Sequence, residues 1–419
     1  MARSRKVYWL VAALVALALV VTLLSSRGKG PSGSGADKSL ANDAALVERG
    51  RYLATAGNCA SCHTRTGGAP FAGGLAFETP FGKLYSSNIT ADPVHGIGNW
   101  SPGELRRALH EGVSARGYRL FPAFPYPSFT KITDEDVKAI YAYLQTVAAD
   151  AYDPPSNSFL LQQRWGMVVW NGLFFHPGRF QPDSGESAEW NRGAYLVAAL
   201  GHCGACHTPR NRFMAEIQDK AYQGGVIPER VAGDEVREWS AVNLTSSPVG
   251  LKEWNVAGLT KYLHTGFSPR AGTFGPMNEV IANSTSKLTA EDAQAMATYI
   301  KSLPAAGETD TKPADAAGEG IYKDRCAKCH GDSGRGGMFQ GPPLFASAVV
   351  RSSNPASLIN AILYGATAPE GIKLGAWETM KPYADILSDA EVAAVASYVR
   401  GTWGNQASAV SAAQVAKQR

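Results

Sequence analysis

The chain has 419 residues, which is enough for two or three ordinary domains, each with its own buried core. Its formal net charge of +4 is close to neutral for this length, so the composition indicates no nucleic-acid partner. The 44 glycines, the 24 prolines and the hydrophobic share of 45% are typical of a loop-rich globular protein.

Residues 1–28 are predicted to form an N-terminal membrane anchor or signal. Arg3, Arg5 and Lys6 precede the uncharged segment Val7–Leu24. A helix of this length rises about 27 Å, close to the hydrocarbon thickness of a bilayer. A cleaved signal peptide has the same basic start, but its apolar region is usually shorter and ends in an Ala-x-Ala site, which is not evident here. Both interpretations stay open, with the anchor favoured. The basic residues predict a cytoplasmic N-terminus, and therefore a single-pass inner-membrane protein with its body in the periplasm.

All six cysteines belong to three Cys-x-x-Cys-His motifs. Two thiols at this spacing can each add to one vinyl group of a haem, and the adjacent histidine then reaches the iron. The sequence therefore predicts three covalently attached c-type haems. Their attachment residues and first axial ligands are Cys59, Cys62 and His63, then Cys203, Cys206 and His207, then Cys326, Cys329 and His330.

Other uses of paired cysteines fit this pattern less well. Structural disulfides would not require a histidine after every second cysteine. A tetrahedral zinc site needs two pairs close enough to share the metal, whereas these pairs lie more than a hundred residues apart. A thioredoxin-like redox motif is normally single and follows a strand.

An internal repeat accompanies the motifs. Gly-x-Tyr precedes each motif, at residues 50–52, 193–195 and 320–322. A capped helix follows each motif far downstream, at residues 132–144, 288–300 and 387–399, with Thr133, Thr289 and Ser388 as N-caps. The repeat predicts a mostly α protein made of three tandem class I cytochrome c domains, at residues 44–152, 188–304 and 314–403, after the N-terminal transmembrane helix.

Two other segments stand outside the repeat. Residues 162–175 are rich in aromatic and aliphatic side chains, which fits a membrane surface, a partner subunit or ordinary core packing between the first two domains. The polar, alanine-rich tail at residues 405–419 is expected to be disordered.

Methionines occupy the expected position of the second axial ligand in two of the three repeats. Met277 lies twelve residues before Thr289, and Met380 lies eight residues before Ser388, in the loop that must pass the haem before the final helix. A thioether is the ligand that raises the potential of a low-spin electron carrier. Met277 and Met380 are therefore predicted to be axial ligands.

The first repeat has Phe124 at this position, and no methionine lies between His63 and Gly166. His95, His110 and Met167 are the candidate substitutes, and an iron without a protein ligand on that side is the remaining possibility. His110 has a counterpart, His264, in a repeat that already has Met277, and Met167 follows the closing helix. His95 is specific to the first repeat and is the preferred side-chain candidate.

Several long stretches carry a family resemblance: NCASCHT, residues 87–101, FPYPSFTKITDEDVKAIYAYL, GHCGACHTPRN, GPMNEVIANSTSKLTAEDAQAMATYIKSLP and SDAEVAAVASYVRGTWGN. They make the sequence similar to the triple-haem cytochrome c subunits of bacterial membrane-bound dehydrogenases. Those enzymes oxidise alcohols, gluconate or fructose, or are molybdenum-containing aldehyde or nicotinate dehydrogenases. The resemblance covers nearly the whole exported part.

The resemblance implies a catalytic partner subunit, which is a quinoprotein, a flavoprotein or a molybdenum enzyme. That partner passes electrons through the three haems to ubiquinone or another respiratory acceptor, and this chain performs no substrate chemistry itself. Many relatives have Pro-Ala-Met-Pro-Tyr where residues 122–126 read Pro-Ala-Phe-Pro-Tyr. The departure at Phe124 leaves a second hypothesis open, a self-standing peroxidase-like enzyme that uses an open first haem.

Overall fold

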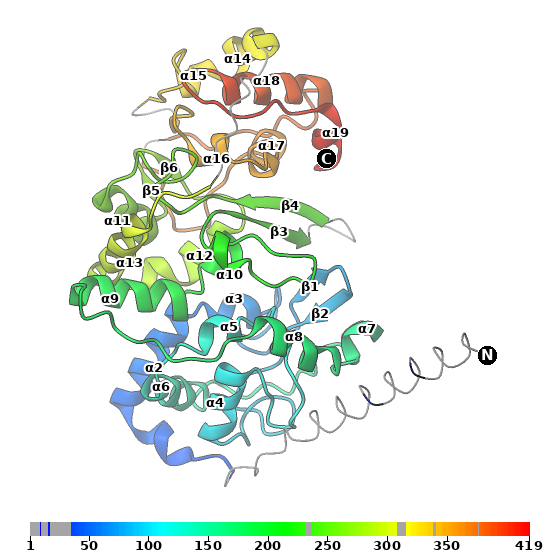
Figure 1. The fold of residues 1–419 in the computed structure, drawn as a ribbon, viewed down its shortest axis with the longest axis vertical. Coiled ribbons are helices and arrows are strands. Elements are labelled where there is room, and N and C mark those ends of the chain that lie inside the picture. The colour runs from blue at the N-terminus through cyan, green and yellow to red at the C-terminus, as the bar shows by residue number, and fades with distance from the viewer. Residues whose placement is uncertain are drawn as a thin grey trace. The chain divides into compact units, whose positions relative to one another are not determined.

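The computed structural model describes Trp9, Ala16 and residues 35–230, 236–307, 316–337, 341–375 and 377–419. Apart from Trp9 and Ala16, the predicted transmembrane segment Val7–Leu24 lies outside these residues. Within the described part of the chain, no helix is both long and apolar enough to cross a bilayer. The structure is mostly helical, with three two-stranded antiparallel hairpins (Figure 1). It divides into two compact units: the described residues up to Leu53 with Cys62–Phe180, and Ala54–Ser61 with Gln181–Arg419.

The N-terminal part of the chain contains one strand hairpin among short helices. The elements are η1 (Lys38–Asn42), α2 (Ala44–Ala56), α3 (Cys59–His63), β1 (Ala76–Thr79), β2 (Gly82–Tyr85), α4 (Pro102–Glu111), α5 (Tyr126–Phe129), α6 (Asp134–Leu144), α7 (Phe159–Gln162) and α8 (Gly166–Phe174).

The rest of the chain repeats this pattern of short helices and adds two hairpins. Its first elements are α9 (Ala188–Tyr195), the π-helix η2 (Leu196–Leu200), α10 (Gly204–His207), η3 (Gln218–Lys220), β3 (Gly225–Arg230), β4 (Val236–Ala241), α11 (Val256–Thr265), β5 (Phe267–Ser268), β6 (Ala271–Gly272), α12 (Met277–Asn283), η4 (Thr285–Lys287) and α13 (Ala290–Ser302). Its last elements are η5 (Ala316–Gly318), α14 (Glu319–Arg325), α15 (Ala327–His330), α16 (Ala348–Arg351), α17 (Ala356–Tyr364), α18 (Asp389–Gly401) and α19 (Ala412–Ala416).

Glycines bring the first and last helices of each repeat into close contact. A Cβ atom added to Gly50 of α2 would lie 1.8 Å from the carbonyl oxygen of Ala139 in α6. At Gly193 of α9 it would lie 1.9 Å from the carbonyl oxygen of Ala295 in α13. Because glycine has no Cβ atom, the two helix backbones can touch at these points.

The third repeat uses a different glycine from the one that the Gly-x-Tyr alignment predicts. A Cβ atom at Gly318 would lie 2.2 Å from the carbonyl oxygen of Ala394 in α18, whereas nothing lies within 4 Å of one at Gly320. Gly318, and not Gly320 of the Gly-x-Tyr sequence, therefore lies at the crossing in the third repeat. The ring of Tyr322 packs against Tyr398 in the core of the third repeat.

The predicted caps of the three final helices are confirmed. In each, the hydroxyl of the N-cap residue accepts a hydrogen bond from the backbone N–H three residues later, which satisfies one of the N–H groups left without a helical partner. The pairs are Thr133 with Asp136 at 3.2 Å, Thr289 with Asp292 at 3.2 Å and Ser388 with Glu391 at 3.4 Å.

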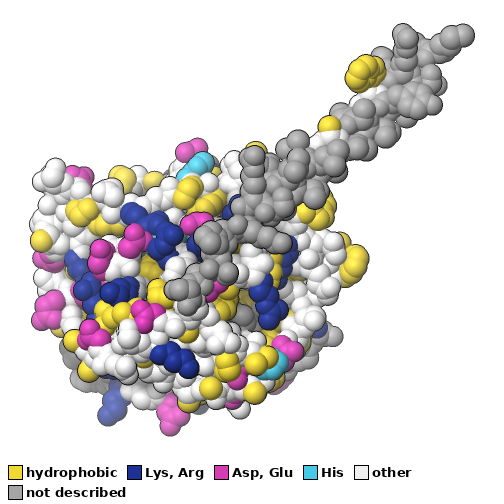
Figure 2. Space-filling model, turned by 90° about the horizontal axis from the view of Figure 1, so that it is seen from below, with side chains coloured by type: hydrophobic (Ala, Val, Ile, Leu, Met, Phe, Trp, Pro, Cys, Tyr) yellow, Lys and Arg dark blue, Asp and Glu magenta, His cyan; other side chains and the backbone are white. Residues whose placement is uncertain are grey.

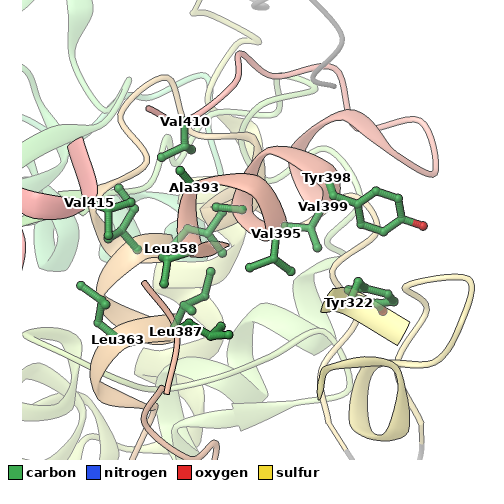
Figure 3. Packing of buried hydrophobic residues seen from close by; sticks show 14 of the residues in the cluster. Tyr322, Leu358, Leu363, Leu387, Ala393, Val395, Tyr398, Val399, Val410 and Val415 are labelled. Carbon is green, nitrogen blue, oxygen red and sulfur yellow. The ribbon is translucent and has the colours of Figure 1, made fainter. Parts of the chain in front are cut away.

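The third repeat packs around a compact hydrophobic cluster formed by α17, α18 and their neighbours (Figure 3). Val415 of α19 is fully buried in this cluster, and the guanidinium of Arg419 contacts the carboxylate of Asp389 at 2.7 Å. The expectation of a disordered tail is therefore wrong. The polar, alanine-rich composition hid the contribution of Val410 and Val415, whose side chains anchor the tail in the cluster.

Helix α8 explains the aromatic segment at residues 162–175. One face of it packs on the first repeat, where Asn171 accepts a 2.5 Å hydrogen bond from the hydroxyl of buried Tyr126. On the opposite face, Trp165, Val169 and Leu173 recur every four residues and are 62%, 45% and 63% exposed. One face of α8 therefore packs on the first repeat, and the other presents an apolar stripe. Core packing between the first two domains stays a prediction.

Candidate haem sites

The three motif histidines share one hydrogen-bond arrangement. Each lies at the end of a short helix, and its Nδ1–H donates to a backbone carbonyl in a loop further along the chain. The pairs are His63 with Ser87 at 2.7 Å, His207 with Val242 at 2.7 Å and His330 with Pro342 at 2.8 Å.

This arrangement prepares each imidazole to bind iron. A ring that donates from Nδ1 presents the lone pair of Nε2, and the hydrogen bond fixes the orientation of the ring. Burial lowers the pKa of His63, His207 and His330, while the carbonyl contact acts in the opposite direction. The neutral form, which is the form that binds a metal, is therefore favoured at each site.

Two asparagines hold the acceptor carbonyls in place. Asn88 follows Ser87, and its Oδ1 accepts hydrogen bonds from both the backbone N–H and the hydroxyl of Thr90. Asn243 follows Val242 and makes the same two contacts with Thr245. These Asx turns fix the backbone next to the carbonyl that orients the histidine. The Asn-x-Thr sequence at residues 88–90 and 243–245 is a repeated signal, but the sequence analysis did not identify the histidine contact beside it.

The first cysteine of the second motif and the first cysteine of the third motif are half-buried thiols with weak acidity. Burial raises the pKa of Cys203 to about 12 and that of Cys326 to about 11, and the neighbouring motif cysteine adds to both shifts. A redox-active Cys-x-x-Cys pair has a lowered pKa on its attacking thiol. The electrostatic environment therefore argues against the thioredoxin-like alternative at these two motifs.

A cavity in the third repeat brings together Cys326, His330 and Met380, the residues predicted to bind one haem. It encloses about 990 Å³, including its open mouth, and apolar side chains such as Leu358 and Val399 line most of it. The donor set and the apolar lining fit a c-type haem.

In the second repeat, Met277 is the first residue of α12 and is half-buried. The loop that leads to it, Gly275–Pro276, passes against the ring of Trp239, where a Cβ atom at Gly275 would come within 2.6 Å. The ligation of iron by Met277 and Met380 stays a prediction.

Comparison with known proteins fits these sites. The family model "Cytochrome c" matches residues 47–148, and the model "Cytochrome C oxidase, cbb3-type, subunit III" matches residues 313–399. The chain is 37% identical to the cytochrome c subunit of the quinone alcohol dehydrogenase of Gluconacetobacter polyoxogenes, over 90% of this chain and 85% of that protein. It is 38% identical to the gluconate 2-dehydrogenase cytochrome c subunit of Pantoea cypripedii, over 90% of each chain.

The chain belongs to the family of dehydrogenase cytochrome c subunits. It is also 42% identical to a nicotinate dehydrogenase subunit of Pseudomonas putida over 85% of this chain, but it spans only 30% of the length of that protein. Family membership establishes c-type haem as the cofactor and electron transfer as the activity.

The first repeat of this cytochrome subunit presents a phenyl ring where the other two have a thioether. Phe124 is half-buried and packs edge-on against Phe129, with the ring centroids 5.4 Å apart. The preferred substitute, His95, is exposed, and its Nδ1 lies 3.8 Å from the carboxylate of Asp153. The structure thus gives His95 a surface carboxylate as neighbour, and its ligation to iron stays untested.

The two other candidates of the first repeat are buried. Met167 lies on the packed face of α8. His110 is fully buried, and its Nδ1 lies 3.5 Å from the Asp134 carboxylate, too far for a good hydrogen bond. Burial lowers the pKa of His110 to about 4, and nearby Arg179 adds to the shift. His110 is therefore a neutral imidazole at physiological pH.

Proposed function

We propose that the protein is a triple-haem subunit of a periplasmic, membrane-bound dehydrogenase complex, which carries electrons from the catalytic subunit to ubiquinone or another respiratory acceptor. The observation that carries the proposal is the Nδ1–carbonyl hydrogen bond of each motif histidine, because it leaves three Nε2 atoms available for iron next to three Cys-x-x-Cys pairs.

The helix contacts support three cytochrome c domains with the predicted boundaries. The first and last helices of each repeat meet backbone to backbone at Gly50, Gly193 and Gly318, and each motif lies a few residues after the crossing. Family models match the first and third repeats. The second repeat shares its crossing geometry and its caps with them.

The residues of this chain would hold the cofactors rather than react with substrate. A haem supplies one-electron chemistry at its iron when it is bound. His63, His207 and His330 would provide neutral imidazoles in fixed orientations, and Met277 and Met380 would provide thioethers to the second and third irons. The apolar lining of the third cavity would surround the haem there. Loss of the thioether at Phe124 lowers the potential of the first haem relative to the other two.

Sequence and surface features support attachment to the membrane. Val7–Leu24 is long enough to span a bilayer. Further along the chain, the backbone N–H of Asp37 donates to the hydroxyl of Tyr141, which ties the start of the first repeat to α6. The exposed stripe Trp165, Val169 and Leu173 belongs to a stretch, residues 154–182, that contains Arg164 and Arg179 but no acidic residue. Such a surface suits anionic lipid headgroups. By contrast, the face in Figure 2 mixes basic and acidic side chains.

The partner follows from the relatives. Subunits of alcohol, gluconate and nicotinate dehydrogenases are among them, which supports a catalytic dehydrogenase subunit as the partner. The family resemblance implies that this subunit is a quinoprotein, a flavoprotein or a molybdenum enzyme. Purification of the native complex from its source, followed by identification of the bound cofactor, decides among the three. A chain that purifies without any dehydrogenase subunit would contradict this part of the proposal.

Haem content tests the proposal directly. The full chain, made in a host that attaches haem c, should gain the mass of three haems. His207→Met, in the native complex placed in liposomes with ubiquinone, should abolish substrate-driven quinone reduction. His264→Gln is the matched control, because His264 lies in the same repeat on α11 and outside the motif. A wild-type chain with fewer than three haems, or equal effects of the two variants, would refute the proposal.

A second candidate function rests on Phe124. A phenyl ring cannot ligate iron, so the first haem could bind a small oxidant, as in a peroxidase-like enzyme. Carbon monoxide added to the reduced protein distinguishes the two functions. A spectral change confined to the first haem, with turnover of peroxide, supports the enzyme. The absence of any change at all three haems eliminates it.

A further inference from the structure

One wall of the third cavity comes from the second repeat. Residues 270–274 line it together with His330 and Met380. They belong to the hairpin formed by β5 and β6, residues 267–272, and to the segment that follows it, between α11 and Met277.

The hairpin is seated firmly against the loop that leads to Met380. The rings of Phe267 and Trp377 meet edge to face with centroids 4.8 Å apart. A Cβ atom at Gly272 would lie only 3.0 Å from the side chain of Leu374. Just after the hairpin, the side-chain amide of Asn278 donates to the carbonyl of Thr367 at 2.8 Å. The second repeat is therefore a fixed part of the third site.

Arg270 lies in the turn of this hairpin. Among the described residues that line the cavity, Arg270 is the one arginine or lysine and Glu378 is the one carboxylic acid. Arg270 is 35% exposed on its side chain, and its nearest carboxylate partner, Glu253, is at 3.9 Å, which is a loose ion pair. Its guanidinium can therefore turn toward an anion in the cavity.

A haem presents such an anion. Its two propionates are carboxylates, and an apolar pocket offers them few partners unless a cation lies at its edge. A planar guanidinium matches a carboxylate in two parallel hydrogen bonds.

We propose that Arg270, supplied by the second repeat, binds a propionate of the haem in the third repeat and thereby raises the reduction potential of that haem. The inference rests on the proposed function, since it requires a haem at His330. Arg270 is a positioning residue: its positive charge stabilises the ferrous state, in which the iron centre carries one positive charge less.

Redox titration of the full-length holoprotein tests the inference. Met380→His, which replaces the thioether, first identifies the wave of the third haem by its displacement. In Arg270→Gln, the reduction potential of the third haem should fall. The ferric–ferrous equilibrium of this haem should shift about three- to tenfold toward the ferric form; tenfold is about 59 mV for one electron. Arg270→Lys, which keeps the charge but loses the planar fork, should give a smaller shift.

The control is Arg212→Gln, which removes one positive charge from an exposed position of the same repeat, outside the cavity lining. An unmoved third wave in Arg270→Gln, or an equal shift in Arg212→Gln, would overturn the inference. Both outcomes leave the proposed function intact, because the haem count of the wild-type chain tests that separately. If Arg270→Gln fails to retain three haems, Arg270→Lys takes its place in the test. A lower potential of the third haem than in wild type then supports the inference, and an unchanged potential overturns it.

Discussion

Two glycines of the third repeat, two residues apart, should respond oppositely to the same substitution. In Gly318→Ala, the new methyl group would lie 2.2 Å from the carbonyl oxygen of Ala394, 2.4 Å from its carbonyl carbon and 2.6 Å from the Cα of Val395. All three are backbone atoms of α18, so no side chain can rotate away. In Gly320→Ala, the methyl group meets nothing within 4 Å.

The magnitudes follow from these contacts. Ordinary van der Waals contact needs about 3.5 Å between such atoms, so α18 must move by roughly 1 Å in Gly318→Ala. Overpacking of this kind costs about 1–3 kcal/mol, and rigid backbone places the cost at the upper end. Gly320→Ala adds no overlap and gains about 1 kcal/mol of helix propensity in α14. The two variants should therefore differ by about 3–4 kcal/mol in the free energy of unfolding.

Guanidinium unfolding of the holoprotein, followed through the absorbance of the haems, measures the difference. The midpoint of the transition that includes the third haem should fall in Gly318→Ala and stay or rise in Gly320→Ala. Equal effects of the two substitutions, or a larger loss in Gly320→Ala, would show that the helices do not cross at Gly318.

Three further predictions concern a buried histidine, a helix cap and a distal methionine. His110 has a pKa of about 4 in the folded state, below the ordinary value of 6.5, so the unfolded chain takes up the proton first as the pH falls. The free energy of unfolding should therefore fall by about 3 kcal/mol between pH 6.5 and pH 4. Denaturant titrations of His110→Gln should lack this decline. Thr289→Ala removes the cap of α13 and should lower the free energy of unfolding by about 1 kcal/mol in denaturant titrations, whereas Thr265→Ala, near the exposed end of α11, should cost less. Met380→Ala should lower the potential of the third haem and let carbon monoxide bind it; a normal potential and no binding would exclude Met380 as a ligand.

Much of the local structure was predictable because its signals are local. Each of the three final helices begins with an N-cap residue and an acidic residue three positions later, a pattern that predicts a helix start; the caps are Thr133, Thr289 and Ser388. The cysteine motifs by themselves predict covalent haem attachment. The crossing glycine of the third repeat was not predictable. The sequence offers Gly318 and Gly320 within one turn, and only the packing of α18 distinguishes them.

Contacts distant in sequence were also beyond prediction. The carbonyls of Ser87, Val242 and Pro342 have no side-chain signature, so nothing in the sequence identified them as histidine partners. The repeated Asn-x-Thr was the available signal, and it occurs at two of the three sites. The wall that residues 270–274 give to the third cavity depends on the packing of one repeat against another, which no periodicity encodes.

The hairpin at residues 267–272 has a consequence for any attempt to study the third repeat by itself. An excised fragment beginning at residue 314 would lack that wall, and bulk water would reach the part of the cavity that residues 270–274 line in the intact protein. Water dipoles would then reorient at every change of iron charge, which raises the reorganisation energy and slows electron exchange. Rates measured on such a fragment would therefore underestimate the speed of the intact protein.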